Sequence, residues 1–256
     1  MTNAPCIVIV GSSADALASA VAASLRRRGA DVLCADPFDL TGLRVSLYEE
    51  RFTVEDRRVG AIVFRAPPDM SFSRSFRAED RSFCDAETRA LWLAASHLPS
   101  VLAVNRYGAG AWFGGTGWTR WRGLFLEAGL PLAPFAFGDV SDNEEHYHWH
   151  PYAAGQAHVA PGRATRRTLG AALTPSEQAQ VSLVVRGEVV EGEALPAVSE
   201  AAVLLQDIGI HVASIATDGK GRVLRVDALP VVERRASVQR SAHLISHLCH
   251  AHLRRW

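Results

Sequence analysis

Short apolar runs alternate with amphipathic stretches through the first hundred residues. The run 6–11 is apolar throughout and ends in glycine, which is typical of a strand buried on both faces of a parallel sheet. Apolar positions then recur at helical spacing over 16–28, where Ser13 or Asp15 could cap the helix and arginines precede Gly29 at its end. The same patterns predict further elements: strands at 31–35, 59–65 and 102–105, and a long helix at 79–96. This β-α-β order predicts an α/β unit over 1–105.

The second half of the chain has a different pattern of apolar and polar residues, and five glycines between 108 and 117 separate it from the first half. The pattern there predicts the following elements: a short helix at 121–129, a strand at 131–137, a hairpin at 179–190, a helix at 199–208, strands at 211–216 and 222–226 around a tight turn at 218–221, and a final helix at 236–253. Two domains are therefore expected, an α/β domain at 1–105 and an α+β domain at 106–256.

Composition excludes several classes of protein. The 256 residues carry 27 basic and 27 acidic side chains, so no overall field would recruit nucleic acid or a membrane surface. The N-terminus lacks a signal-peptide pattern and no apolar run is long enough to span a bilayer, so we expect a cytoplasmic protein. Four scattered cysteines form no metal or redox motif. Lys220 is the only lysine, which leaves one candidate for any site that needs a phosphate-binding lysine.

Three sequence motifs occur in an order that resembles a known family. They are Phe64-Arg-Ala-Pro-Pro68 with the helix and Val104-Asn-Arg106 that follow it, the segment Trp121 to Pro134, and the segment Ile208 to Pro230. Together they resemble the ATP-grasp ligases that modify ribosomally made peptides, the graspetide or microviridin-type maturases. The resemblance implies a pre-ATP-grasp α/β domain followed by a reduced ATP-grasp-like α+β domain, in a bacterial peptide-modification pathway. It also implies that the cofactors of an active member would be ATP and Mg²⁺.

The departures from the family pattern fall on the residues that would carry the chemistry. Ser214, Arg225 and Asp227 stand where the resemblance implies metal-binding Asp, Glu and Asn, and a cation at Arg225 would repel magnesium. Arg120 or Arg122 replaces the opening phosphate lysine, and Lys220 lies in a turn. We therefore expect a catalytically altered or inactive member without a bound cofactor. The alternative is an active ligase, with Asp218 and Asp227 as metal ligands, Arg225 and Asp227 at the catalytic position, and Arg120, Arg122 and Lys220 on the nucleotide.

Aromatic, arginine and histidine side chains suggest surfaces for a peptide substrate or a partner enzyme, with a homodimer left open. The candidates are Arg106, Trp112, Trp118 and Trp121 near the glycine-rich passage, and His146, His148 and His150 on one side of an extended segment. The histidines could instead bind a metal or form ordinary polar surface, and the tryptophans could pack on the core. On the final helix, His243, His247 and His250 share a face that is either solvated or a cationic groove for an acidic peptide.

Overall fold

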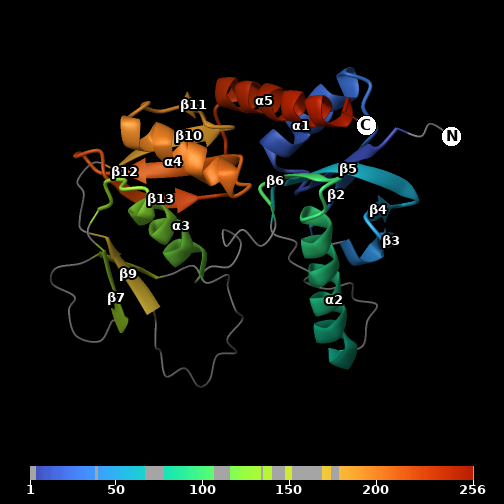
Figure 1. Cartoon of the computed structure of the whole chain (residues 1–256), viewed down its shortest axis with the longest axis horizontal. Helices are drawn as coiled ribbons and strands as arrows, with labels where there is room; N and C mark the ends of the chain where they lie inside the picture. Colours follow the sequence, from blue (N-terminus) through green and yellow to red (C-terminus); the bar gives the residue numbers. More distant parts are fainter. Residues whose placement is uncertain are drawn as a thin grey trace. The chain divides into compact units, whose positions relative to one another are not determined.

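The computed structural model describes residues 4–37, 40–66, 78–106, 116–133, 135–139, 148–151, 169–173 and 179–255. The chain folds into two compact units (Figure 1). Unit 1 comprises Met1–Tyr107, Ile208–Val212 and Leu229–Trp256, and unit 2 comprises Gly108–Asp207 and Ala213–Ala228. Within the described ranges, no helix has the length and apolar character needed to cross a membrane.

Unit 1 is built on a six-stranded mixed sheet. Its strands are β1 (Cys6–Val10), β2 (Val32–Ala35), β3 (Val45–Tyr48), β4 (Arg51–Val54), β5 (Arg57–Phe64) and β6 (Leu102–Val104), joined by the short helix η1 (Leu40–Gly42) and the helices α1 (Ala16–Arg27) and α2 (Ala78–Ser96). The order is β2-β1-β5-β4-β3, and β6 pairs with β5. The central pairs β1–β2, β1–β5 and β5–β6 are parallel, as the β-α-β pattern predicts.

The core of unit 1 follows from the apolar runs in the sequence. All five residues of β1 are buried, as are the last six of β5, because a sheet covered on both faces leaves no polar side. Trp92 of α2 is fully buried and meets Phe52 and Phe64 edge to face, with ring centroids 5.4 and 6.3 Å away. At the start of α1, Asp15 rather than Ser13 accepts the capping hydrogen bond, from the Ala18 amide.

The last helix, α5 (Arg235–Leu253), packs in unit 1 against α1 and β5 (Figure 1). Its buried side includes Val238, Ala242, Ile245 and Cys249. The expected division into domains 1–105 and 106–256 remains a prediction. The compact units group α5 with the first half of the chain, because its apolar stripe is covered there.

In the described part of unit 2, the strands form a four-stranded and a three-stranded sheet, accompanied by the helices α3 (Thr116–Glu127) and α4 (Pro196–Asp207). The strands are β7 (Phe135–Asp139), β8 (His148–Pro151), β9 (Leu169–Leu173), β10 (Gln180–Val185), β11 (Glu188–Glu191), β12 (Val212–Thr217) and β13 (Val223–Asp227). The four-stranded sheet has the order β11-β10-β12-β13, and the three-stranded sheet has the order β7-β9-β8. The predicted hairpins at 179–190 and 211–226 are both present, each with a positive-φ glycine at or beside its turn, Gly187 or Gly221.

Sequence patterns did not predict four of the strands. The β3–β4 hairpin turns at Glu49 and Glu50, and Glu49 adopts the left-handed backbone conformation with φ 52°. Glutamate is not a usual turn former, so the apolar alternation on either side of these two residues does not by itself predict a hairpin. Strands β8 and β9 pair with each other across a long separation in the chain, which local periodicity does not reveal.

Candidate functional site

One face of the β12–β13 hairpin brings together the residues that the sequence singled out. Ser214 lies opposite Asp227 in the antiparallel register, and Ala216 lies opposite Arg225. Because side chains alternate along a strand, these four residues share one face of the sheet. Arg225 is exposed, and Ser214 and Asp227 are half-buried. The face thus carries one hydroxyl, one carboxylate and one guanidinium.

The opposite face of the same hairpin is apolar. Ile215 is fully buried and lies opposite Val226, and Leu224 is buried beside it. Helix α4 packs against the neighbouring strands β10 and β11 of this sheet. The alternation of side chains from Ser214 to Ala216 and from Leu224 to Asp227 places Ser214, Arg225 and Asp227 on the face opposite Ile215 and Leu224, where their polar groups can reach solvent.

Asp218 lies in the turn that joins β12 to β13, and both of its carboxylate oxygens are engaged there. Oδ1 accepts hydrogen bonds from the backbone amides of Lys220 and Arg222, each at 2.9 Å. Oδ2 accepts from Nε of Arg222 at 2.7 Å and forms an ion pair with Nη2 at the same distance. The side chain is buried, and these bonds build the turn.

The turn makes a pH-dependent contribution to stability. Burial by itself would raise the pKa of Asp218, but the hydrogen bonds from Arg222 and Lys220 outweigh it, so the pKa lies below its ordinary value of 3.8. A carboxyl whose pKa is lowered on folding stabilises the protein above the ordinary value, and this contribution disappears as the pH falls through the folded-state pKa. The turn is therefore weakened only in acid.

We expect Asp218→Asn to lower the free energy of unfolding by about 1.5 kcal/mol at neutral pH, because the charge-assisted bonds to Arg222 are lost. Urea denaturation between neutral and acid pH would measure the difference from wild type, which should shrink below about pH 4. Asp207→Asn, at an exposed carboxylate in the same unit, is the control and should change little. If the loss of unfolding free energy stayed constant down to about pH 2.5, the shape of the Asp218 side chain rather than its charge would explain the effect.

The two predicted magnesium ligands do not come together. The backbone of Asp218 pairs with that of Arg222. Asp227 lies five residues beyond Arg222 along the extended strand β13, which places it roughly 16 Å from the turn. No group of three or more His, Cys, Asp or Glu side chains suited to a metal occurs in the described ranges. Magnesium takes several oxygen ligands, whereas this face offers one carboxylate beside a cation. The described residues of this face by themselves therefore do not make a magnesium centre, and the roles of Asp218 and Asp227 as ligands stay predictions.

The predicted nucleotide-binding residues lie in different environments. Arg122 of α3 is buried and donates from Nη2 to the Ala133 carbonyl at 2.9 Å. Burial lowers the pKa of Arg122, and its guanidinium carbon lies 5.9 Å from the centre of the Trp121 ring. Lys220 is exposed at the turn. Arg120 belongs to α3, but its side chain is not among those described.

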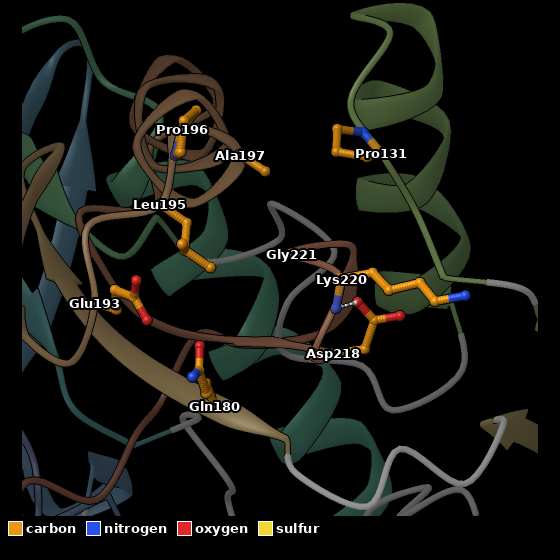
Figure 2. A pocket seen from close by; sticks show the side chains of 10 residues that line it. Pro131, Gln180, Glu193, Leu195, Pro196, Ala197, Asp218, Lys220 and Gly221 are labelled. Atoms are coloured by element: carbon orange, nitrogen blue, oxygen red, sulfur yellow. Dashed lines mark hydrogen bonds between the residues drawn. The ribbon is translucent and has the colours of Figure 1, made fainter.

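A cavity of about 560 Å³ lies next to the Asp218 turn, within unit 2. It is lined by residues from four places: Pro131; Gln180 at the start of β10; Glu193 and Leu195 with Pro196 and Ala197 at the start of α4; and the turn 218–221. Glu193 and Gln180 face it from the side opposite Asp218 and Lys220 (Figure 2). Sequence patterns did not mark Gln180 or Glu193, because nothing local distinguishes them from ordinary surface residues. Arg225 and Asp227 do not line this cavity.

The predicted recognition residues have different environments. Trp121 is buried and packs on Phe125, with ring centroids 5.2 Å apart, so it contributes to the core of unit 2. Arg106 follows β6, and its backbone amide donates to the Gly209 carbonyl. The backbone of Trp118 is in α3, and His148 and His150 are in β8, without description of their side chains. Trp112 and His146 lie outside the described residues.

The chain is similar in structure to solved ATP-grasp ligases over nearly its whole length. The ATP-grasp ligase PsnB complexed with minimal precursor, Mg and ADP matches with a TM-score of 0.67 and 18% identity, over 97% of this chain and 98% of that one. The macrocyclase MdnC of Microcystis aeruginosa MRC, bound with the precursor peptide MdnA, matches with a TM-score of 0.65 and 12% identity over 94% and 99%. This chain has the ATP-grasp fold. The predicted fold class is thereby confirmed.

A third similar structure is a Chryseobacterium gregarium RiPP-associated ATP-grasp ligase in complex with ADP and a leader and core peptide. Its TM-score is 0.64 at 9% identity, over 96% of this chain and 97% of that one. No protein-family model and no curated protein matches the sequence. The predicted resemblance to peptide-modifying ATP-grasp ligases is confirmed by structure, whereas the expected loss of activity is not shown.

Proposed function

We propose that this ATP-grasp-fold protein binds a ribosomally made peptide and takes part in its ligation, in a peptide-modification pathway. The observation that carries the proposal is the match over at least 94% of both chains to ligases solved with precursor, leader or core peptides. A fold shared over this length supports a shared ability to hold a peptide. Fold alone does not assign a reaction, so the residues of the site must do so.

The open face of the β12–β13 hairpin supports contact with a peptide. Arg225 can bind a peptide carboxylate through paired hydrogen bonds, and Asp227, two residues further along the same face, can accept bonds from amides or amines. The hydroxyl of Ser214, opposite Asp227, can donate or accept. In the same sheet, β11 is an edge strand, and peptides commonly bind by adding a strand at such an edge.

The comparisons favour the candidate in which this protein is itself a ligase. The similar structures are named as ligases or macrocyclases, and several contain ADP, AMPPNP or Mg. On this basis the protein joins a peptide carboxylate to an amine or hydroxyl at the expense of ATP. Asp227, the one carboxylate described on the open face, is then the residue to substitute.

A second candidate is peptide or partner binding without ligation, and one observation favours it. Arg225 shares the open face with Asp227, and this cation opposes a magnesium ion at the position where the resemblance implies metal ligands. In that case the protein presents a peptide to another enzyme. The two candidates share peptide binding and differ in whether a new covalent bond appears.

The test uses purified protein and synthetic peptides made from each short reading frame found beside its gene. Calorimetry measures binding of each peptide, with and without ATP and Mg²⁺, and mass spectrometry then detects loss of water from the peptide. We expect binding and a dehydrated product, with the product reduced at least about tenfold in Asp227→Ala and unchanged in the control Asp207→Ala.

The outcomes separate the candidates. Peptide binding without product, in wild type supplied with ATP and Mg²⁺, would support the non-ligating candidate. An equal yield from wild type and Asp227→Ala would remove Asp227 from the chemistry while leaving the ligase in place. Failure of folded wild-type protein to bind any of these peptides would overturn the proposal.

A further inference from the structure

The helices α1 and α5 form a surface whose charge departs from that of the whole chain. The chain has equal numbers of basic and acidic residues. These two helices contain no Asp or Glu, and their basic and titratable residues are Arg26, Arg27, Arg235, Arg240, His243, His247, His250 and His252. The formally charged side chains of these two adjacent helices are therefore all positive, although the whole chain is balanced.

A groove runs between these helices within unit 1. A cavity of about 390 Å³ lies there, lined by Ala20, Ala23, Ser24 and Arg27 of α1 and by Gln239, Ala242 and His243 of α5. Three of the seven lining residues are alanines, so a backbone can approach the floor closely. Arg27 and His243 stand exposed at its rim. We call this groove and its rim the α1–α5 groove.

Exposed basic side chains in and next to the groove have no partner among the described residues, and Arg235 lies one turn of α5 before the lining residue Gln239. Arg235, Gln239, His243 and His247 follow one another at four-residue spacing along α5, and all four are exposed. Within the described ranges, Arg27, Arg235, His243 and His247 make no hydrogen bond or ion pair through their side chains.

Some arginines outside the groove are engaged within the protein. Arg44, Arg57, Arg65 and Arg222 each pair with a carboxylate of their own chain. The groove therefore has cations to offer to a carboxylate from outside.

We propose that the α1–α5 groove docks an acidic segment of a peptide or protein partner. Carboxylates of the segment pair with Arg27 and Arg235, while its backbone and aliphatic carbons rest on the alanines. The alanine floor favours a peptide over a nucleic acid, whose phosphates would gain nothing from apolar contact. The inference goes beyond the proposed function, since it concerns other residues and holds whether or not ligation occurs.

The test measures fluorescence anisotropy of labelled octaglutamate with the full chain at about 50 mM salt. We expect Arg27→Glu combined with Arg235→Glu to weaken binding at least about tenfold, because both contacts become repulsive. The affinity of wild type should fall as salt is raised, and this dependence should be smaller in the double variant. Both positions are exposed, so the variant should fold, which circular dichroism would check.

The matched control is Arg51→Glu combined with Arg186→Glu, which changes the net charge equally at two residues outside the α1–α5 groove. It should bind octaglutamate like wild type. Equal weakening in both double variants would mean that net charge alone acts, and would overturn the proposal. So would absence of binding to wild type, or tighter binding of an oligonucleotide of the same charge than of octaglutamate.

Discussion

Replacing Asn105 with alanine is expected to lower the free energy of unfolding by about 4 kcal/mol, one of the two largest effects expected here. Asn105 follows β6 and is 1% exposed. Its Oδ1 accepts hydrogen bonds from the backbone amides of His211 and Val212 at 2.9 and 2.8 Å, and its Nδ2 donates to the Val212 carbonyl at 2.9 Å. The Asn105 side chain thus satisfies the backbone amides of His211 and Val212 and the Val212 carbonyl at the start of β12.

Alanine would leave these backbone groups without their partner in a buried place, where each unsatisfied group costs about 1–3 kcal/mol. The backbone of Asn105 also has φ 58°, a conformation that asparagine tolerates better than alanine. Urea denaturation followed by circular dichroism measures the change.

Two further variants divide the Asn105 effect into its causes. Asn105→Gly accepts the backbone conformation but removes all three bonds, so it should remain strongly destabilised. Asn105→Asp keeps the two acceptor contacts but, when ionised, buries a carboxylate oxygen against the Val212 carbonyl, so it should be strongly destabilised at neutral pH and less so in acid, where the protonated carboxyl can donate to that carbonyl. If glycine restored wild-type stability, backbone strain rather than hydrogen bonding would explain the alanine result.

Arg65→Ala is expected to cost about 3 kcal/mol, because it breaks an ion pair inside unit 1. The Arg65 side chain is 3% exposed and lies 3.0 Å from Oδ2 of Asp15 through Nη2, which also donates to the Pro230 carbonyl at 2.8 Å. Nε donates to Asp15 at 3.1 Å. Removal leaves a half-buried carboxylate and a buried carbonyl without these bonds. Thermal or urea unfolding would show the loss.

The exposed pair between Arg57 and Asp31 is the matched control for Arg65. Its N–O distance is 3.1 Å, but the two side chains are 45% and 49% exposed, so Arg57→Ala should cost no more than about 0.5 kcal/mol. A double-mutant cycle with Asp15→Ala then isolates the coupling between Arg65 and Asp15. Equal losses at Arg65 and Arg57 would contradict the importance of burial for this pair.

Much of the fold could be read from the sequence because its strands and helices have strong local patterns. The apolar runs of β1 and β5 and the stripes of α1 and α5 appear where periodicity predicts them. The motifs around Arg65, Trp121 and Asp227 were sufficient to suggest the ATP-grasp fold, which the solved structures confirm. Strands β8 and β9 were missed because their partners are distant in the chain.

The sequence by itself determined which residue types occupy the positions of Ser214, Arg225 and Asp227, and hence that one carboxylate stands beside a cation. Only the tertiary structure decided that these three share an open face, that both carboxylate oxygens of Asp218 are engaged within its turn, roughly 16 Å from Asp227, and that Trp121 is core. It also decided that α5 returns to lie beside α1. The physical reason is that periodicity reports which side of an element is apolar, whereas register and packing between distant segments decide which polar groups meet.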